Sequence, residues 1–428
     1  MISFITPTHN PKYLRETYQS LLDQTNSAWE WVLVPNGGVD EAKIREALNA
    51  SSDPLIPVNQ KVRILQLPDA LEGTGIGSIK KWAFSQGEGD YLAELDHDDL
   101  LVKTAVEEIE KAFKSSQADF VYSNSADFFP NGNGHWFPNW KENGWRYRDT
   151  TIDGKWYNEC LSFAPSAAAL SVIYYAPNHI RCWRKDFYTK VGGHNPAYKV
   201  CDDHELCVRT YLQGTMHHID KLLYLYRMSE DNTFSKKLDE IRNLTFDLYV
   251  KNIEALILRE SVLTGKPCYD LGGAFNCPKG WMSVDLEGGD ITADLNKKWP
   301  FADNSVLAFR AHDFIEHLPD KQHVMKELHR CLIPGGWALI QVPSTDGRGA
   351  FMDPTHVSYW NECSFWYYTR PESAKYIRND DCHFMDSRLF TFFPTAWHEE
   401  NKIPYVKAEL RKIGGNMDGV SGRRRFGV

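Results

Sequence analysis

Short apolar runs alternate with amphipathic segments through the first third of the chain, and few architectures fit this pattern. Runs at 2–6, 29–34, 62–67, 91–95 and 120–123 have the length of buried strands, and segments 11–24 and 76–85 have helical periodicity. Strands that alternate with helices are typical of βαβ units and a mostly parallel sheet. The sequence therefore predicts an α/β domain at this end.

A second series of the same kind begins near residue 268. Strand-like runs lie at 268–271, 281–285, 306–311 and 337–342, with a helix expected at 321–331. The stretch between the two series, 236–263, is amphipathic and lacks strand signals. We predict an α/β domain at 1–235, a helical linker at 236–264 and a second α/β domain at 265–428.

Composition narrows the functional classes. The net charge of −9 argues against a broad nucleic-acid surface, so nucleic acid is disfavoured as a partner without being excluded. Nine cysteines without CxxC spacing predict reduced thiols. With no apolar stretch long enough for a bilayer span and no secretory signal, we expect a cytoplasmic protein without a transmembrane segment. Composition sets no oligomeric state.

An acidic turn follows the run at 91–95. Asp96, Asp98 and Asp99 lie within four residues, at the carboxyl end of a strand, where open α/β sheets bind ligands. Mg²⁺ and Mn²⁺ prefer such oxygen ligands and often share them with substrate phosphates. In the alternative, Asp98 or Asp99 caps a helix expected at 102–113. His97, between them, is expected to face solvent.

The first 235 residues resemble family-2 glycosyltransferases of the GT-A fold, a Rossmann-like nucleotide-diphospho-sugar transferase domain. The resemblance rests on six segments in the family's order: 2–10, 75–81, 87–99, 118–123, 191–193 with 202–209, and 226–227. It implies an inverting, metal-dependent hexosyltransferase-type enzyme that takes a nucleotide sugar, with a UDP-sugar as the expected donor.

The resemblance also assigns roles to residues. Asp96 and Asp98, as a DxD motif, would hold Mn²⁺ or Mg²⁺, and Asp203 would be the base that deprotonates the acceptor hydroxyl. In the alternative, Asp202 and Asp203 form a solvated helix start. The donor would be contacted by Thr6, Pro7, Thr8, Asn36, Lys80 and Asp96.

Three positions depart from the family pattern. Asn36 stands where an acidic residue is common, which leaves the uridine preference open, and Lys80 stands where Arg is usual. Ser229 replaces a frequent His, so the metal would rely more on Asp98 and phosphate oxygens. The aromatic, turn-rich stretch 128–140 is either an acceptor-binding lid or a packed Ω-loop.

The second series resembles class I S-adenosylmethionine (SAM)-dependent methyltransferases, which have a Rossmann-like domain. The resemblance rests on the glycine-rich turn 270–276 and on segments 290–295, 299–303, 313–318 and 327–336. It implies SAM binding by Asp270, Gly272, Gly273, Asp285 and Asp294. Ala274 and Asn276 replace family glycines, and a retained scaffold without methyl transfer is the alternative.

Two further groups in this half attract notice. Glu316 and His317 form a candidate base or metal pair, although this segment mostly packs and caps in the family. Segment 353–356 could line a methyl-acceptor pocket. The leading hypothesis is a bifunctional enzyme that transfers a sugar to a glycan or other hydroxyl acceptor and methylates the product. The alternatives are a glycosyltransferase with a degenerate second domain, and a non-catalytic glycan- or nucleotide-binding protein.

Overall fold

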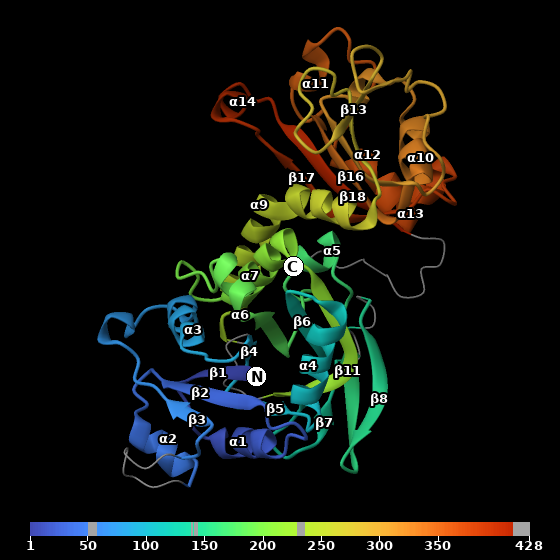
Figure 1. Ribbon diagram of the computed structural model, residues 1–428. Coiled ribbons are helices and arrows are strands. Elements are labelled where there is room, and N and C mark those ends of the chain that lie inside the picture. Colours follow the sequence, from blue (N-terminus) through green and yellow to red (C-terminus); the bar gives the residue numbers. More distant parts are fainter. Residues whose placement is uncertain (50–57, 138–139, 141–143, 229–235, 414–428) are drawn as a thin grey trace. The chain divides into compact units, whose positions relative to one another are not determined.

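The computed structural model describes residues 1–49, 58–137, 140, 144–228 and 236–413, which form two compact units (Figure 1). Apart from residues 139–144, which group with the second unit, the first unit runs to Leu256, and the second runs from Ile257 onward. The division falls within α9 (Leu238–Thr264), one continuous helix that occupies the stretch expected as a linker.

Parallel strands form one half of the sheet in the first unit. β1 (Ile2–Thr8) lies between β2 (Trp29–Pro35) and β4 (Tyr91–Glu94), and β3 (Val62–Ile64) pairs with β2. β1 and β2 are buried along nearly their whole length, as expected for strands covered on both faces. The helical segments of this half are α1 (Leu14–Leu22), α2 (Glu41–Ala47), η1 (Asp69–Leu71) and α3 (Ile76–Ser85).

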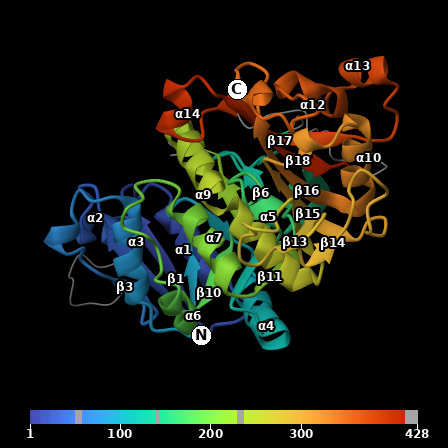
Figure 2. The same cartoon turned by 90° about the horizontal axis from the view of Figure 1, so that it is seen from above.

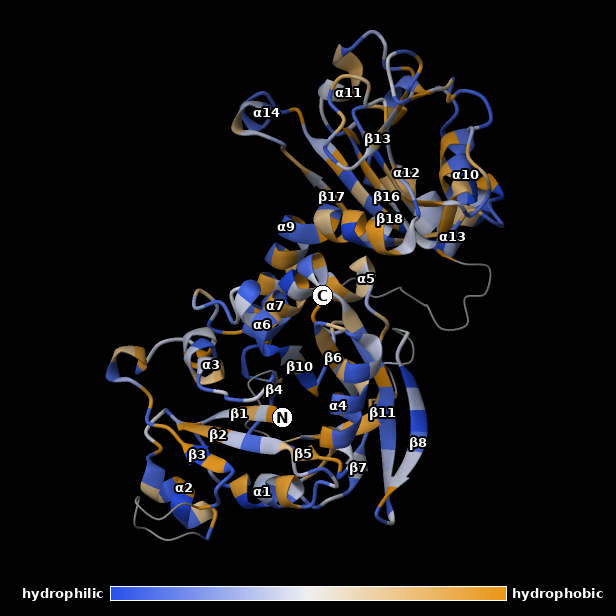
Figure 3. Cartoon of the chain, in the orientation of Figure 1, coloured by the Kyte–Doolittle hydropathy of each residue, from blue (hydrophilic) through white to orange (hydrophobic). Residues whose placement is uncertain are grey.

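The other half of the sheet is mixed. β10 (Arg181–Arg184) runs antiparallel to both β4 and β6 (Phe120–Phe128), and β11 (Met216–Arg227) runs parallel to β6. A hairpin of β8 (Arg146–Ile152) and β9 (Lys155–Leu161) extends from β6, and Figure 3 shows β8 as mostly hydrophilic. The remaining elements are β5 (Leu100–Leu101), α4 (Ala105–Ser116), β7 (Gly134–His135), α5 (Ala167–Leu170), α6 (Lys185–Lys190) and α7 (Asp202–Gln213). Helices α3 and α7 contact each other (Figure 2).

The second unit contains a seven-stranded sheet in the order β14-β13-β12-β15-β16-β18-β17. The strands β12 to β16 are parallel, and β17 and β18 add an antiparallel edge. The strands are β12 (Cys268–Leu271), β13 (Met282–Asp285), β14 (Ile291–Thr292), β15 (Val306–His312), β16 (Leu332–Pro343), β17 (Phe384–Phe392) and β18 (Tyr405–Lys412). The helical segments are η3 (Ile315–His317), α10 (Lys321–Cys331), α11 (Gly349–Met352), α12 (Glu362–Thr369), α13 (Pro371–Ala374), η4 (Lys375–Ile377) and α14 (Ala396–Glu400).

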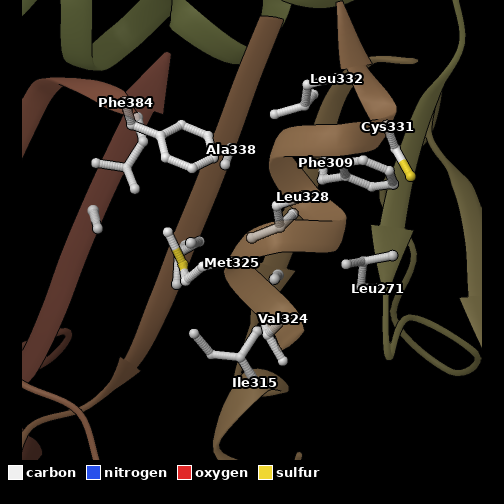
Figure 4. Close-up of a cluster of buried hydrophobic side chains, with 14 of the residues drawn as sticks. Leu271, Phe309, Ile315, Val324, Met325, Leu328, Cys331, Leu332, Ala338 and Phe384 are labelled. Carbon is white, nitrogen blue, oxygen red and sulfur yellow. The ribbon is translucent and has the colours of Figure 1, made fainter. Parts of the chain in front are cut away.

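The core of this unit lies between α10 and the sheet. Val324, Met325 and Leu328 project from α10 toward Phe309 of β15 and Ala338 of β16 (Figure 4). All five side chains are fully buried. Each buried aliphatic or aromatic side chain contributes about 1.5–3 kcal/mol, so this interface stabilises the packing of α10 on the second unit's sheet.

Composition led us to expect reduced thiols and no transmembrane segment, and the cysteines and helices bear on these two points. All nine cysteines are free; six are buried, and Cys363 is exposed. Burial raises the pKa of the buried Cys182, Cys201 and Cys207 thiols. Among the described residues, no helix combines the length and apolar composition that a bilayer span requires.

Candidate active site

The carboxyl ends of three parallel strands of the first unit bring most predicted donor residues to one edge. The Asn36 backbone N–H, after β2, donates to the Thr8 carbonyl oxygen of β1 at 2.9 Å. The rings of His9 and His97 make an edge contact with centroids 4.9 Å apart, which joins the end of β1 to the acidic turn after β4. Pro7, Thr8, Asn36 and Asp96 therefore share this edge.

Thr6 lies beneath that edge. Its side chain is fully buried, donates to the Leu95 carbonyl oxygen at 2.6 Å and accepts from Trp31 Nε1 at 2.8 Å. Both hydrogen bonds join β1 to its neighbours. The side chain that the sequence assigned to donor binding is thus committed to holding the strands together.

The three carboxylates of the acidic turn have different environments. Asp99 is fully buried and accepts hydrogen bonds from the Tyr224 hydroxyl at 2.8 Å and from the Arg227 backbone N–H at 2.7 Å. The Asp96 side chain is 40 % exposed. Burial, reinforced by the charge of Asp96, raises the pKa of Asp98. Asp99 is therefore structural, which leaves Asp96 and Asp98 as the carboxylates that can meet a ligand.

The helix-cap alternative for this turn is wrong. Helix α4 begins at Ala105 with Thr104 as its N-cap residue, so Asp98 and Asp99 lie several residues before the helix. Arg227 closes the turn instead. Its Nε donates to the Asp98 carbonyl oxygen at 2.6 Å, and its Nη2 contacts Glu16 at 2.8 Å. Arg227 of the family-like Tyr226–Arg227 pair thus shapes the acidic turn, while Ser229 lies outside the described residues.

A buried cluster surrounds Glu94, the last residue of β4. Its carboxylate is 1 % exposed and contacts Lys80 Nζ at 2.8 Å, Arg181 Nη1 at 2.9 Å and His194 Nε2 at 3.1 Å. Burial raises the pKa of Glu94, but Lys80 and Arg181 outweigh it and hold the pKa well below its usual range. Lys80, predicted to contact donor phosphates, is thus held by Glu94, and its Nζ also lies 3.9 Å from Asp202.

Asp203 belongs to the same cluster. Its Oδ2 accepts from Arg181 Nη1 at 2.6 Å, and its Oδ1 accepts from the His204 backbone N–H at 2.8 Å in the first turn of α7. Burial raises the pKa of Asp203, but Arg181 and Lys80 more than offset it and lower the pKa far below its usual range. Asp202 is buried against His194 and Lys80, so the pair is not a solvated helix start.

His179 connects the acidic turn to this cluster. Its Nε2 lies 3.8 Å from Asp96 Oδ2 and 3.7 Å from Glu94 Oε2, and its ring stacks on Tyr224. Burial lowers the pKa of His179, with Arg181 acting in the same direction. Sequence reasoning gave no role to Glu94, Arg181, His179 or His194. The sequence did contain one signal: Glu94 stands inside the apolar run 91–95, and an acidic residue in such a run needs a buried partner.

The aromatic stretch has both packed and exposed parts. Trp145 is buried, and its ring meets Phe163 with centroids 4.7 Å apart. Phe129 and Trp156 are 40 % and 48 % exposed. Residues 138–139 of the predicted lid or Ω-loop lie outside the described residues. Phe129 and Trp156 thus expose ring surface, whereas Trp145 is packed.

The glycine-rich turn of the second unit follows β12. Gly272 has a φ of +74°, and a Cβ at this position would collide with the Phe314 ring. Asp270 is buried in a salt bridge with Arg310 at 2.8 Å. Asp285, at the end of β13, accepts from the Ala274 backbone N–H at 3.2 Å. The structure thus places Gly272, Gly273, Asp270 and Asp285 at one sheet edge.

Asp294 is held locally. Its Oδ1 accepts from the Asn296 backbone N–H at 3.1 Å, and Lys297 Nζ lies 3.1 Å from its Oδ2. These contacts form a turn after β14, next to the end of β13. The fifth residue assigned to SAM binding is therefore engaged with its own turn.

In comparisons with known proteins, two family models match separate parts of the chain. A family model described as Glycosyl transferase family 2 matches residues 3–175, and one described as Methyltransferase domain matches 281–340. Chondroitin synthase of Pasteurella multocida (strain Pm70) is 27 % identical over 242 residues, 56 % of this chain and 22 % of that protein. Hyaluronan synthase of Pasteurella multocida is 27 % identical over 241 residues, 56 % of this chain and 21 % of that protein. The chain thus spans about a fifth of the length of these curated relatives.

Among solved structures, Staphylococcus aureus TarS 1–349 in complex with UDP-GlcNAc is similar at 18 % identity and a TM-score of 0.41. The match covers 61 % of this chain and 71 % of that one.

Proposed function

We propose that this chain, which joins a family-2 glycosyltransferase domain of GT-A type to a methyltransferase-like domain, transfers a sugar from a nucleotide-sugar donor to a hydroxyl acceptor. The reaction proposed is a single, inverting displacement. A UDP-sugar is the proposed donor, and a glycan or another hydroxyl compound is the proposed acceptor.

The acidic turn fits a divalent cation. Asp96 and Asp98 provide oxygen ligands, and the raised pKa of Asp98 reflects burial and repulsion that a cation would offset. When bound, Mg²⁺ or Mn²⁺ supplies positive charge to the departing diphosphate. Pro7 and Asn36 line the edge at which the nucleotide would bind, whereas the Thr8 side chain is fully buried there. Lys80 adds positive charge behind the turn through its contact with Glu94.

Asp203 is the proposed base. Its lowered pKa keeps it ionised at neutral pH, so it can accept the proton of the attacking hydroxyl as the bond to the sugar forms. Arg181 orients this carboxylate. A carboxylate held this strongly is a weak base, so proton transfer must accompany the attack rather than precede it.

One observation carries the proposal: Arg181 contacts both Glu94, which leads into the acidic turn, and Asp203. A continuous ion-pair network thereby fixes the proposed base relative to the proposed donor edge. A binding protein would not need this arrangement, since it has no proton to move.

The test uses the full chain with UDP-sugars and Mn²⁺. Asp98→Ala should remove metal-dependent donor binding. Asp203→Asn should keep donor binding, while kcat falls by roughly 10²–10⁴-fold. The matched control is Asp186→Asn, an exposed aspartate in the first turn of α6. Transfer at the wild-type rate by Asp203→Asn would remove Asp203 as the base.

For the second unit we propose SAM binding at the Gly272 turn, with methylation of the sugar-transfer product as the coupled activity. Support comes from Asp285, which lies beside that turn at a strand end, where an acidic residue can bind ribose hydroxyls. Asp285→Ala should weaken SAM binding in calorimetry, and Asp381→Ala, an exposed aspartate of the same unit, should not. Equal affinities would remove Asp285 from the SAM site, and a wild-type chain that binds no SAM would favour the degenerate scaffold, in which Asp270 and Arg310 serve stability alone.

A further inference from the structure

Two segments of the second unit bring together three side chains that the proposed function does not use. Glu316 and His317 lie on η3, just after β15. His356 lies in the loop between α11 and α12. The backbone N–H groups of Val357 and Ser358 both donate to the Glu316 carbonyl oxygen at 2.9 Å, so the two segments are fixed to each other.

The three side chains converge. Each offers one possible ligand atom, and these atoms all lie within 4.8 Å of one another. His356 Nε2 is 4.0 Å from Glu316 Oε1, and the two imidazole rings meet edge to face with centroids 5.0 Å apart. Ligand atoms of a tetrahedral site with bonds of about 2.0 Å are roughly 3.3 Å apart, so the three atoms would have to move closer by at most roughly 1.5 Å around an ion.

Both histidines are oriented by backbone carbonyl oxygens. His356 Nδ1 lies 3.0 Å from the Ala350 carbonyl oxygen, and His317 Nδ1 lies 3.2 Å from that of Thr355. A carbonyl oxygen only accepts, so each Nδ1 carries the proton and each Nε2 keeps a lone pair. Metal-binding histidines are typically held in this way.

Glu316 provides the second, independent observation. Its side chain is 3 % exposed, and within the described part of the chain neither carboxylate oxygen has a hydrogen-bond partner. Buried polar atoms are almost always paired, and an unpaired buried carboxylate is costly.

We propose that Glu316, His317 and His356 bind a divalent first-row transition metal ion. Two imidazole nitrogens with one carboxylate suit Mn, Fe, Co or Zn better than Mg²⁺, whose preference for oxygen matches the acidic turn of the first unit. Three protein ligands leave positions open for water or a substrate oxygen. The site borders the Gly272 turn, because Phe314, two residues before Glu316, packs against Gly272.

The test uses the full chain, stripped with chelator, dialysed and titrated with Co²⁺ as the probe. Visible absorption identifies Co²⁺ with imidazole ligands and separates it from the weakly absorbing all-oxygen site of the acidic turn. Wild type should saturate at a single equivalent in this signal. His317→Ala, His356→Ala and Glu316→Gln should each weaken Co²⁺ binding more than about tenfold. Losses of this size occur even when only a group that orients a metal ligand is changed.

Two controls sharpen the result. His323→Ala removes another histidine of the same unit, on α10, and Asp98→Ala removes the acidic turn's ligand; both should keep the wild-type signal. Glu316→Gln conserves side-chain volume. Its Co²⁺ affinity therefore tests the proposal if circular dichroism shows that a histidine variant fails to fold. No signal in wild type, equal affinity in all three ligand variants, or loss in Asp98→Ala would each overturn the proposal.

Discussion

Arg181 holds two carboxylates from distant parts of the chain. Its Nη1 contacts Glu94, 87 residues away in sequence, at 2.9 Å, and Asp203 at 2.6 Å. Charge at this depth is stabilising only when it is paired, so the three residues depend on one another. The arrangement makes Arg181 a positioning residue for the proposed base.

Arg181→Met should therefore act on stability and on pH dependence together. Breaking a buried ion pair costs roughly 3–5 kcal/mol of unfolding free energy. Arg181 lowers the pKa of Asp203, so its loss should raise that pKa and move the acid limb of kcat/KM to higher pH. Urea unfolding and a pH–rate profile measure the two effects, with Arg181→Lys as the charge-conserving comparison. An unmoved acid limb would contradict the assignment.

Asp127 on β6 should make stability depend on pH in the opposite sense to a salt-bridged acid. Burial raises its pKa from 3.8 to about 7, so the folded state binds its proton more tightly than the unfolded state does. Stability then falls as pH rises between these values, by about 1.4 kcal/mol for each pKa unit. Asp127→Asn should remove this fall in urea unfolding at different pH values, and Asp186→Asn should retain it. A parallel decline in Asp127→Asn would assign the effect elsewhere.

Sequence reasoning found the residues of the site that lie in local motifs. Asp96, Asp98 and Asp203 were identified from their positions after a strand run and a glycine pair, and they remain proposals. Arg181 and His194 have no such local signal, because only tertiary packing brings them to Glu94. The sequence also gave no sign that Asp99 is fully buried while Asp96 and Asp98 of the same turn are partly exposed.

At the scale of elements, the strands of the first unit's parallel half were predictable, whereas β10 and β11 of its mixed half were not. β1, β2 and β4 are mostly apolar runs because both of their faces are buried. β10 has four residues, two of them arginine, and β11 mixes charged and apolar residues, since its exposure changes along its length. The α/β class and the helices at 76–85 and 321–331 are confirmed.

Helix α3 is held by a close approach that only glycine permits. Gly77 donates its N–H to the Tyr198 carbonyl oxygen at 3.2 Å, and a Cβ there would collide with the Asn195 carbonyl oxygen. Gly77→Ala should push α3 outward and draw Lys80 away from Glu94, at about 1–3 kcal/mol of stability. Thermal unfolding and transfer assays should both register the change, whereas Ser78→Ala on the same helix should be near neutral. Unchanged stability in Gly77→Ala would mean that the segment carrying Asn195 and Tyr198 moves away from α3 at little cost in free energy.

At the scale of the whole molecule, each unit has its own sheet, core and candidate ligand edge. A ligand that binds only the folded form of one unit raises the stability of that unit by mass action, by about 2.7 kcal/mol at a hundredfold excess over Kd. In scanning calorimetry, a UDP-sugar with Mn²⁺ should shift one transition and SAM the other. Joint shifts with either ligand would show that the two units unfold as one.

The free cysteines have a practical consequence. Eight of the nine thiols lie in buried or half-buried places that raise their pKa, and the thiolate is the form that reacts with alkylating dyes. Cys363 is exposed on the first turn of α12, the helix after the loop that carries His356. A maleimide fluorophore should therefore attach to the unaltered chain at one place. The natural sequence thus provides its own optical reporter on the helix that follows His356 in sequence.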